Sequence, residues 1–218
     1  NFIEFALAAN LQRQEAIRRR MHLVELPASL KHATLVPNQK DSVILTKSRA
    51  EILSLMSDFI GNFHSPTKKG LYVYGDFGVG KSFLLAALAH DLSEKYSVAT
   101  TMIHYPSFVV NVKNAIQSGQ VKAEIDSVKK ADILILDDIG AEQHSPWVRD
   151  DVLQVILQHR MQENLPTFFT SNFSLADLEK RLSQGKAGDE SWQAKRVMER
   201  IRFLAKEVHL EGENRRHE

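Results

Sequence analysis

The first stretch of chemical interest is rich in glycine: residues 70–85 read GLYVYGDFGVGKSFLL. It contains the pattern G-x-x-x-x-G-K-[ST] between a short apolar run at 71–74 and leucines that recur at helical spacing from Leu84 onward. A strand, a glycine turn and a helix are therefore expected in the order that a phosphate-binding loop requires. Such a loop turns backbone N–H groups toward phosphate oxygens, and the N-terminus of the following helix adds a partial positive charge.

Each residue type in this loop has an expected role. Lys81 is expected to reach the β- and γ-phosphates of a nucleotide, and the hydroxyl of Ser82 is expected to bind Mg²⁺. A chance match to the pattern has a probability of roughly one in a hundred in a chain of ordinary composition. The predicted nucleotide-binding residues are Gly75, Asp76, Phe77, Gly78, Val79, Gly80, Lys81, Ser82 and Phe83.

A second chemical motif is the segment 131–140, which reads ADILILDDIG. Four consecutive apolar residues are typical of a parallel strand that is buried on both faces, and this one ends in Asp137 and Asp138. Ligands of open parallel sheets lie at the carboxyl ends of the strands, so these acids should lie beside the nucleotide. We expect Asp137 to hold Mg²⁺ through water and Asp138 to orient and activate an attacking water.

The elements that position these motifs alternate along the chain. Besides 71–74 and 131–137, strands are expected at 98–103, 166–172 and 208–210. Apolar residues at helical spacing predict helices at 2–21, 46–63, 84–92, 108–116, 121–128, 145–161, 175–182 and 192–204, with Ser107 and Ser174 as helix caps. The sequence therefore predicts an α/β fold with a parallel sheet.

Composition limits the remaining function classes. The chain has 218 residues, and its 28 Lys and Arg against 27 Asp and Glu give a formal charge of +1, which argues neither for nor against nucleic acid. The absence of cysteine excludes disulfides, thiolate catalysis and cysteine-based metal sites. No apolar run approaches the ~20 residues of a membrane span, so we expect no membrane association and a cytoplasmic protein. Because the chain begins at Asn1, we expect that an N-terminal part is missing.

The order of the motifs resembles that of AAA+ ATPases: the phosphate loop, then Leu-Asp-Asp, then the run 166–173 (PTFFTSNF), then 199–203 (ERIRF). Within that superfamily, 136–142 (LDDIGAE) and PTFFTSNF resemble the bacterial replicative-helicase loaders of the DnaC/DnaI type. The resemblance covers residues 26–216 and implies a three-layer fold with a five-stranded parallel sheet, in the order 5-1-4-3-2, flanked by helices and with little or no C-terminal lid. It also implies that residues 1–25 are a helical tail of a helicase-binding domain and that 26–218 are the ATPase domain.

The resemblance further assigns roles to single residues. Asn172 matches the sensor 1 position, and Arg200 matches the arginine finger that completes a neighbouring subunit's site, with Arg202 as second choice. Arg216, with Arg215 beside it, matches the sensor 2 position. Asp138 departs from the usual glutamate by being one methylene shorter.

The resemblance implies an ATP- and Mg²⁺-dependent loader whose subunits associate when ATP is bound and which helps place the replicative DNA helicase on single-stranded DNA. Related proteins have an inserted helix that lines the inner face of the assembly, which suggests Lys113 and Lys122 as DNA contacts. One alternative is a transposase-helper ATPase that binds duplex DNA, and another is a small-molecule kinase. A GTPase is disfavoured because no N/T-K-x-D element is present.

Overall fold

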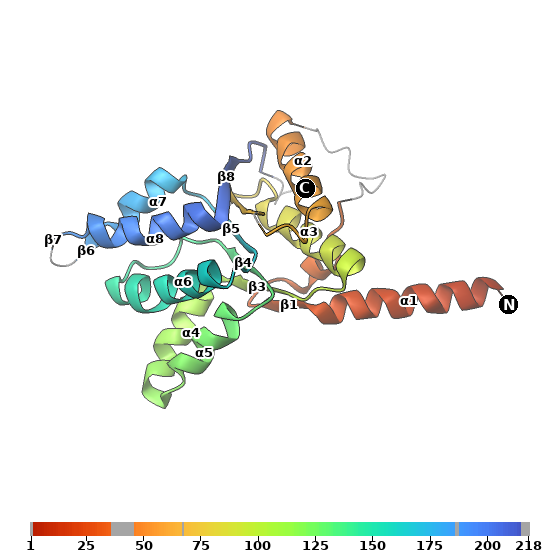
Figure 1. The fold of residues 1–218 in the computed structure, drawn as a ribbon, viewed down its shortest axis with the longest axis horizontal. Helices are drawn as coiled ribbons and strands as arrows, with labels where there is room; N and C mark the ends of the chain where they lie inside the picture. Colours follow the sequence, from red (N-terminus) through yellow and green to blue (C-terminus); the bar gives the residue numbers. More distant parts are fainter. Residues whose placement is uncertain (1, 36–45, 67, 186–187, 215–218) are drawn as a thin grey trace.

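The apolar run 133–136 forms the centre of a parallel sheet whose two faces are both covered by helices (Figure 1). The computed structural model describes residues 2–35, 46–66, 68–185 and 188–214. The sheet has six strands in the order β1-β3-β4-β5-β2-β8, and every neighbouring pair is parallel. Their bounds are β1 Met21–Val24, β2 Gly70–Tyr74, β3 Thr100–His104, β4 Ile133–Asp137, β5 Thr167–Ser171 and β8 Ala205–His209.

The strand order confirms the predicted order 5-1-4-3-2 for the five expected strands, and adds a sixth. Residues 21–24, expected to lie at the end of a helix and in the segment after it, form β1 and pair with β3, with Met21 opposite Thr100. The helix α1 therefore ends at Arg20. Residues that favour helices continue past Arg20 in the sequence, so local periodicity does not predict the end of the helix there. Residues 21–24 form a strand because they pair with β3, almost 80 residues away.

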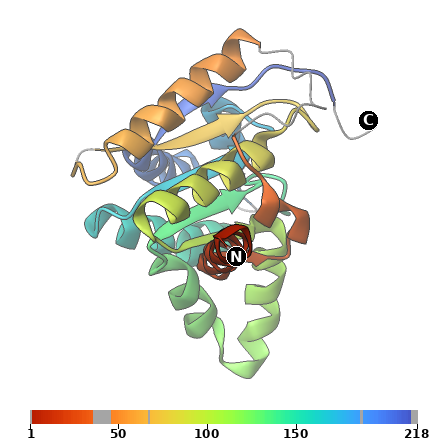
Figure 2. The ribbon, with the colours of Figure 1, turned by 90° about the vertical axis from the view of Figure 1, so that its right-hand side faces the viewer.

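Helices cover the two faces of the sheet in separate groups (Figures 1 and 2). On one face lie α1 Phe2–Arg20, α2 Lys47–Gly61 and α3 Lys81–Tyr96. On the other lie α4 Tyr105–Ser118, α5 Val121–Lys129, α6 Gln154–Gln162 with a π-helical turn at Val148–Leu153 before it, α7 Leu175–Leu182 and α8 Ser191–Leu204. A 3₁₀ turn at Ala28–His32 and a small hairpin of β6 Gln184–Gly185 and β7 Gly188–Asp189 complete the described elements.

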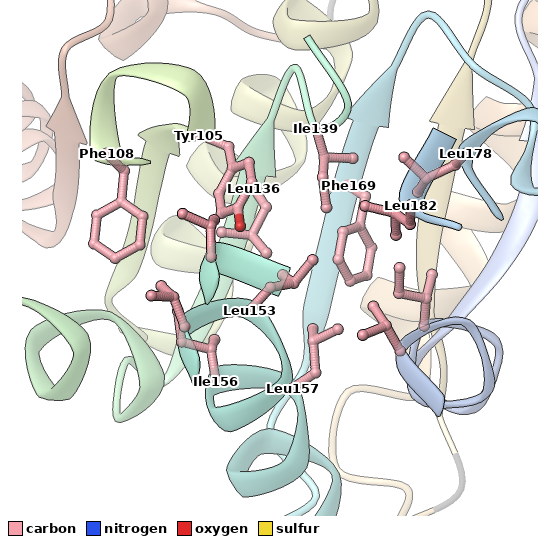
Figure 3. Close-up of a cluster of buried hydrophobic side chains, with 14 of the residues drawn as sticks. Tyr105, Phe108, Leu136, Ile139, Leu153, Ile156, Leu157, Phe169, Leu178 and Leu182 are labelled. Carbon is pink, nitrogen blue, oxygen red and sulfur yellow. The ribbon is translucent and has the colours of Figure 1, made fainter. Parts of the chain in front are cut away.

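The alternation of side chains along β4 divides the core into two clusters. Ile133 and Ile135 face α2 and α3, whereas Leu134 and Leu136 face the layer of α4 to α8. Figure 3 shows the second cluster, in which Leu136 and Phe169 from the strands meet residues of α6 and α7. Because both faces of the sheet are buried, the strand ends are the places where polar side chains can reach a ligand.

The helix caps were predicted in part. The side chain of Ser174 accepts a hydrogen bond from the backbone N–H of Asp177 at 3.2 Å, which confirms it as the cap of α7. Ser107 does not cap α4, because the helix already begins at Tyr105, directly after β3. The hydroxyl of Ser107 instead makes a 2.7 Å hydrogen bond with Nδ1 of His104.

A fully buried arginine fixes the opposite end of the sheet from these polar strand ends. The guanidinium of Arg160 donates to the hydroxyl of Thr167 at 2.8 Å and to the carbonyls of Ala131 and Pro166 at 2.6 and 2.7 Å. Burial lowers the pKa of Arg160 to about 9, so the group stays charged at neutral pH. Its hydrogen bonds hold α6 against the starts of β4 and β5.

The described part of the chain after α8 contains β8 and extended residues up to 214 and no helical lid, as expected. In the same described residues, no helix has both the length and the apolar character needed to cross a bilayer.

Candidate nucleotide-binding site

A cavity of about 600 Å³ lies at the carboxyl ends of the strands, beside the start of α3. Its position is the one expected for a ligand of an open parallel sheet. The residues that line it are Glu25, Leu26, Pro27, Leu30, Phe77, Gly78, Gly80, Lys81, Ser82, Phe83, His104, Asp137, Asp138, Thr170 and Asn172.

The predicted phosphate loop connects β2 to α3 along one wall of this cavity. Gly80 has φ of 97°, a left-handed conformation that favours glycine, and the helix begins at the next residue. Gly75 lies so close to the backbone that an added Cβ would come within 2.2 Å of the carbonyl oxygen of Leu210. The two glycines therefore let the backbone turn tightly and present its N–H groups beside the start of α3.

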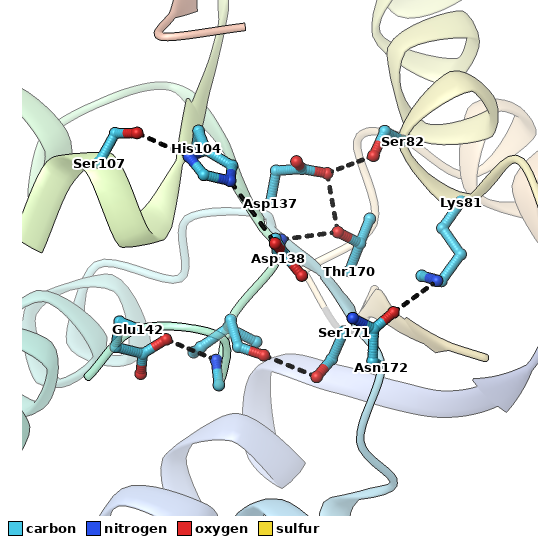
Figure 4. A network of polar contacts seen from close by, with 12 residues as sticks. Lys81, Ser82, His104, Ser107, Asp137, Asp138, Glu142, Thr170, Ser171 and Asn172 are labelled. Carbon is cyan, nitrogen blue, oxygen red and sulfur yellow. Dashed lines mark hydrogen bonds and ion pairs between the residues drawn. The ribbon is translucent and has the colours of Figure 1, made fainter. Parts of the chain in front are cut away.

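Lys81 is buried within this loop. Its ammonium donates to the carbonyls of Gly75 at 2.8 Å and Asp76 at 2.7 Å. It also donates to Oδ1 of Asn172 at 3.0 Å (Figure 4). The sequence-predicted sensor residue and the phosphate-loop lysine, 91 positions apart, thus lie in direct contact. Phosphate oxygens placed in this cavity would meet the ammonium and the side-chain amide together.

The carboxylate of Asp137 is hydrogen-bonded to the side chains of Ser82 and Thr170. Oδ1 of Asp137 accepts hydrogen bonds from the hydroxyls of Ser82 at 2.6 Å and Thr170 at 2.8 Å (Figure 4). Burial raises the pKa of Asp137, and the two hydrogen bonds oppose that rise. A hydroxyl and a buried carboxylate side by side are hard oxygen donors of the kind that Mg²⁺ prefers. The donor set therefore fits the predicted magnesium site, and Ser82 and Asp137 would hold the ion.

Asp138 has a left-handed backbone conformation, with φ of 61°, which few non-glycine residues adopt. Its backbone N–H donates to Thr170 Oγ1 at 2.8 Å, and this contact anchors the turn that follows β4. Oδ2 of Asp138 lies 3.5 Å from Nε2 of His104, and the side chain is about one-third exposed. The carboxylate is thus held at the rim of the cavity, where a water molecule can reach it.

The loop after β4 is held by a second set of hydrogen bonds. The buried carboxylate of Glu142 accepts from the backbone N–H of Gly140 at 2.7 Å, and the Ser171 hydroxyl donates to the carbonyl of Ile139 at 2.6 Å (Figure 4). Arg181 of α7 donates to the carbonyl of Glu142 at 2.9 Å. The segment that carries Asp138 is therefore tied both to β5 and to α7.

Three parts of the site were missed in the sequence. Thr170 lies within the expected strand end 166–172 but was given no role of its own, and His104 ends β3, where a polar residue at a strand end could have signalled it. The third part is the wall formed by Glu25, Leu26, Pro27 and Leu30, to which the sequence assigned no role in the site. Together with Phe77 and Phe83 it gives the cavity an apolar side next to the phosphate loop, which suits a nucleotide base.

Several predicted residues do not line the cavity. Asp76 and Val79 contribute backbone to the loop, and Val79 is buried in the core. Arg200 of α8 donates from Nε to Oε1 of Gln158 at 2.6 Å, and Arg202 pairs with Glu179 at 3.0 Å. Neither arginine is among the residues that line this chain's own site.

The predicted DNA contacts and the second sensor also lie apart from the cavity. Lys113 is half-buried on α4, and Lys122 is exposed on α5. Tyr105 and Phe108, two aromatic residues at the start of α4, are both buried in the core. Arg216 and its neighbour Arg215 lie outside the described residues.

The chain is similar in sequence and in structure to known proteins. The chain is 45% identical over 172 residues to the replicative helicase loader DnaI of Bacillus subtilis (strain 168), an alignment that covers 78% of this chain and 55% of the relative. The chain thus spans about half the length of that relative. A crystal structure of a proposed primosome component from Streptococcus pyogenes serotype M3 superposes with a TM-score of 0.77 at 55% identity, covering 92% of this chain and 98% of the other. A crystal structure of DnaI superposes with a TM-score of 0.75 at 36% identity, covering 92% and 99% of the two chains.

A model of the family described as IstB-like ATP-binding protein matches residues 5–218. This match includes the phosphate loop, both aspartates of the second motif and Asn172. The chain belongs to the IstB-like family of ATP-binding proteins.

Proposed function

We propose that this chain is the ATPase part of an ATP-dependent helicase loader of the replication primosome, which assembles with the replicative helicase and helps place it on single-stranded DNA. The observation that carries the proposal is a complete nucleotide site in a chain so similar to a replicative helicase loader. A loader of a bacterial replicative helicase acts in the cytoplasm. Residues 1–25 are proposed to end a helicase-binding part. Within them, α1 is the helical tail, and β1 joins this tail to the ATPase sheet by pairing with β3.

The contacts in the site support hydrolysis of ATP. Lys81 would bind the β- and γ-phosphates, and Asn172, which Lys81 already contacts, would lie beside the γ-phosphate. Asp138 would orient the attacking water and accept its proton, while His104 at 3.5 Å positions the carboxylate. Bound Mg²⁺ would supply charge neutralisation at the phosphate oxygens.

Self-association in the ATP-bound state would complete this site. Arg200 and Arg202 lie on α8 and do not line their own chain's cavity, as expected of a finger that acts on a neighbour. Trp192 and Phe203 on the same helix are 71% and 52% exposed, which fits a helix that is covered by another protein. We therefore propose that α8 of one subunit faces the phosphate loop of the next.

Two alternatives share parts of the evidence. A transposase-helper ATPase would have the same site, and the high similarity to a helicase loader favours the loader. A small-molecule kinase needs an acceptor group beside the γ-phosphate, whereas the polar residues there, Asp138 and Asn172, suit the activation of water.

Replacement of Lys81 by alanine should lower ATP affinity at least tenfold, because a charge-assisted phosphate contact is worth ~1.5–3 kcal/mol. Asp138→Asn should leave ATP affinity unchanged and abolish turnover, because Asp138 acts on water. Nucleotide titration and phosphate release measure the two effects. Lys95→Ala, which removes an exposed lysine from the same helix, is the matched control and should change neither. Unchanged affinity in Lys81→Ala would refute the assignment of the loop.

If Arg200 acts on a neighbour's ATP, turnover should rise faster than linearly with protein concentration. Arg200→Ala and Lys81→Ala should each be inactive alone, and mixing them should restore part of the activity, because some interfaces then pair an intact finger with an intact loop. Arg196→Ala, one turn earlier on α8, controls for loss of charge from this helix. If mixing restores no activity, or if Arg200→Ala is active alone, then either Arg202 is the finger or the action on a neighbour's ATP is refuted.

Single-stranded DNA should bind in an ATP-dependent and salt-sensitive way, with a slope of about −0.7 per contacted phosphate. The double variant Lys113→Ala, Lys122→Ala should weaken this binding without changing ATP affinity, since both lysines lie outside the nucleotide cavity. Fluorescence anisotropy at two salt concentrations measures it, and Lys47→Ala with Lys95→Ala is the control for net charge. Equal affinity for duplex DNA would favour the transposase-helper alternative.

The loader function itself predicts that the intact protein captures the replicative helicase. In a pull-down with purified helicase, the amount recovered should depend on ATP, and Lys81→Ala should lose that dependence while remaining folded. Recovery of no helicase in either condition would contradict the proposal.

A further inference from the structure

A group of possible metal ligands lies on α3, away from the nucleotide site. The side chains of His90, Asp91 and Glu94 each place one ligand atom so that all three atoms lie within 4.8 Å of one another. None of the three lines the nucleotide cavity. At 1.5 Å of rise per residue, His90 is about 14 Å along the helix from Lys81.

His90 is the unusual member of this cluster. Its side chain is only 8% exposed, and Nδ1 has no hydrogen-bond partner among the residues that the structure describes. The nearest acidic atom is Oδ1 of Asp91 at 3.6 Å, which is beyond hydrogen-bond length. Buried ring nitrogens are nearly always satisfied, so a buried nitrogen that faces a carboxylate without bonding to it needs an explanation.

Asp91 lies beside this nitrogen with its carboxylate about one-third exposed, so an ion that enters from solvent can reach both groups. A cation between the two side chains would stabilise the carboxylate and give Nδ1 of His90 a partner. Both groups thus favour the same kind of ligand.

We propose that His90, Asp91 and Glu94 bind a divalent transition-metal ion of the zinc or cobalt class. One imidazole nitrogen and two carboxylate oxygens are common ligands for such ions. Tetrahedral ligands at about 2.1 Å from an ion lie roughly 3.4 Å apart, so a small rotation of these side chains closes the cluster. The remaining coordination position is left to water.

The site is coupled to α1 through Glu94. Oε1 of Glu94 forms an ion pair with the guanidinium of Arg13 of α1 at 2.7 Å. Both side chains are partly exposed, and ion pairs on such a surface are weak. A metal ion on Glu94 competes with the guanidinium of Arg13 for the same carboxylate. Ile17, which is buried, and Arg20, which donates to the carbonyl of Ser93 at 3.5 Å, still hold the C-terminal half of α1 when Arg13 is released.

The test is a Co²⁺ titration of the nucleotide-free full chain, read by the visible absorption that imidazole and carboxylate ligands give to Co²⁺. The wild type should bind one Co²⁺ with this absorption, and Zn²⁺ should displace it. His90→Ala and Asp91→Asn should each weaken binding at least roughly tenfold. Asp91 is one-third exposed, so Asp91→Asn tests the site even if His90→Ala fails to fold.

Two further variants separate this site from adventitious binding. His159→Ala removes a histidine of α6 and should leave the titration unchanged. Arg13→Ala should tighten Co²⁺ binding several-fold, because it frees Glu94, whereas Arg19→Ala removes the same charge from the same helix and should not. Absence of saturable Co²⁺ absorption, or its persistence in both His90→Ala and Asp91→Asn, would overturn the site. Equal effects of Arg13→Ala and Arg19→Ala would overturn the competition with α1.

Discussion

The site depends on one buried carboxylate, that of Asp137. A carboxylate inside a protein is expensive unless it is hydrogen-bonded, and its raised pKa reflects that cost. Here the hydroxyl of Ser82 from the start of α3 and that of Thr170 from β5 both donate to one oxygen of Asp137 at the end of β4. Three segments far apart in the sequence are therefore fixed relative to one another at the point where the phosphate loop ends and α3 begins.

The sequence predicted those parts of the fold and site that depend on local patterns. The phosphate loop and the strand before Asp137 are as expected from such patterns, and the order of five strands is the one that the resemblance to AAA+ ATPases implied. Strand β1 was not predicted, because its pairing with β3 is decided by residues almost 80 positions away. His104 was missed because a single polar residue at a strand end carries no motif, and only the sheet register, which places it opposite Asp137, brings it to the site. Arg200 could be placed on a helix from sequence, whereas its partner Gln158 depends on how α6 packs against α8.

Helix α6, with the π-helical turn before it, is the element that positions α8. Arg149 in that turn is buried, donates to the carbonyl of Leu182 at 2.8 Å and pairs with Glu190, the residue before α8, at 2.6 Å. Farther along, Gln158 accepts from Arg200 at 2.6 Å. Both ends of α8 are thus attached to one rigid support, so the arginine proposed to reach a neighbouring subunit lies at a defined angle, and its guanidinium has to leave Gln158 to do so.

The carboxylate of Asp138, proposed to act on water, is also connected to the helices proposed to contact DNA. Asp138 lies against Nε2 of His104, and the other ring nitrogen bonds to Ser107 in the first turn of α4 (Figure 4). Lys113 lies six residues farther along that helix, on an element whose core side is held by Tyr105 and Phe108. A helix packed in this way moves as a unit, because its buried aromatic residues resist bending. A shift of Asp138 when the γ-phosphate binds or leaves would therefore move α4 at its N-terminus and displace Lys113. The nucleotide site would in this way be coupled to the surface proposed for DNA.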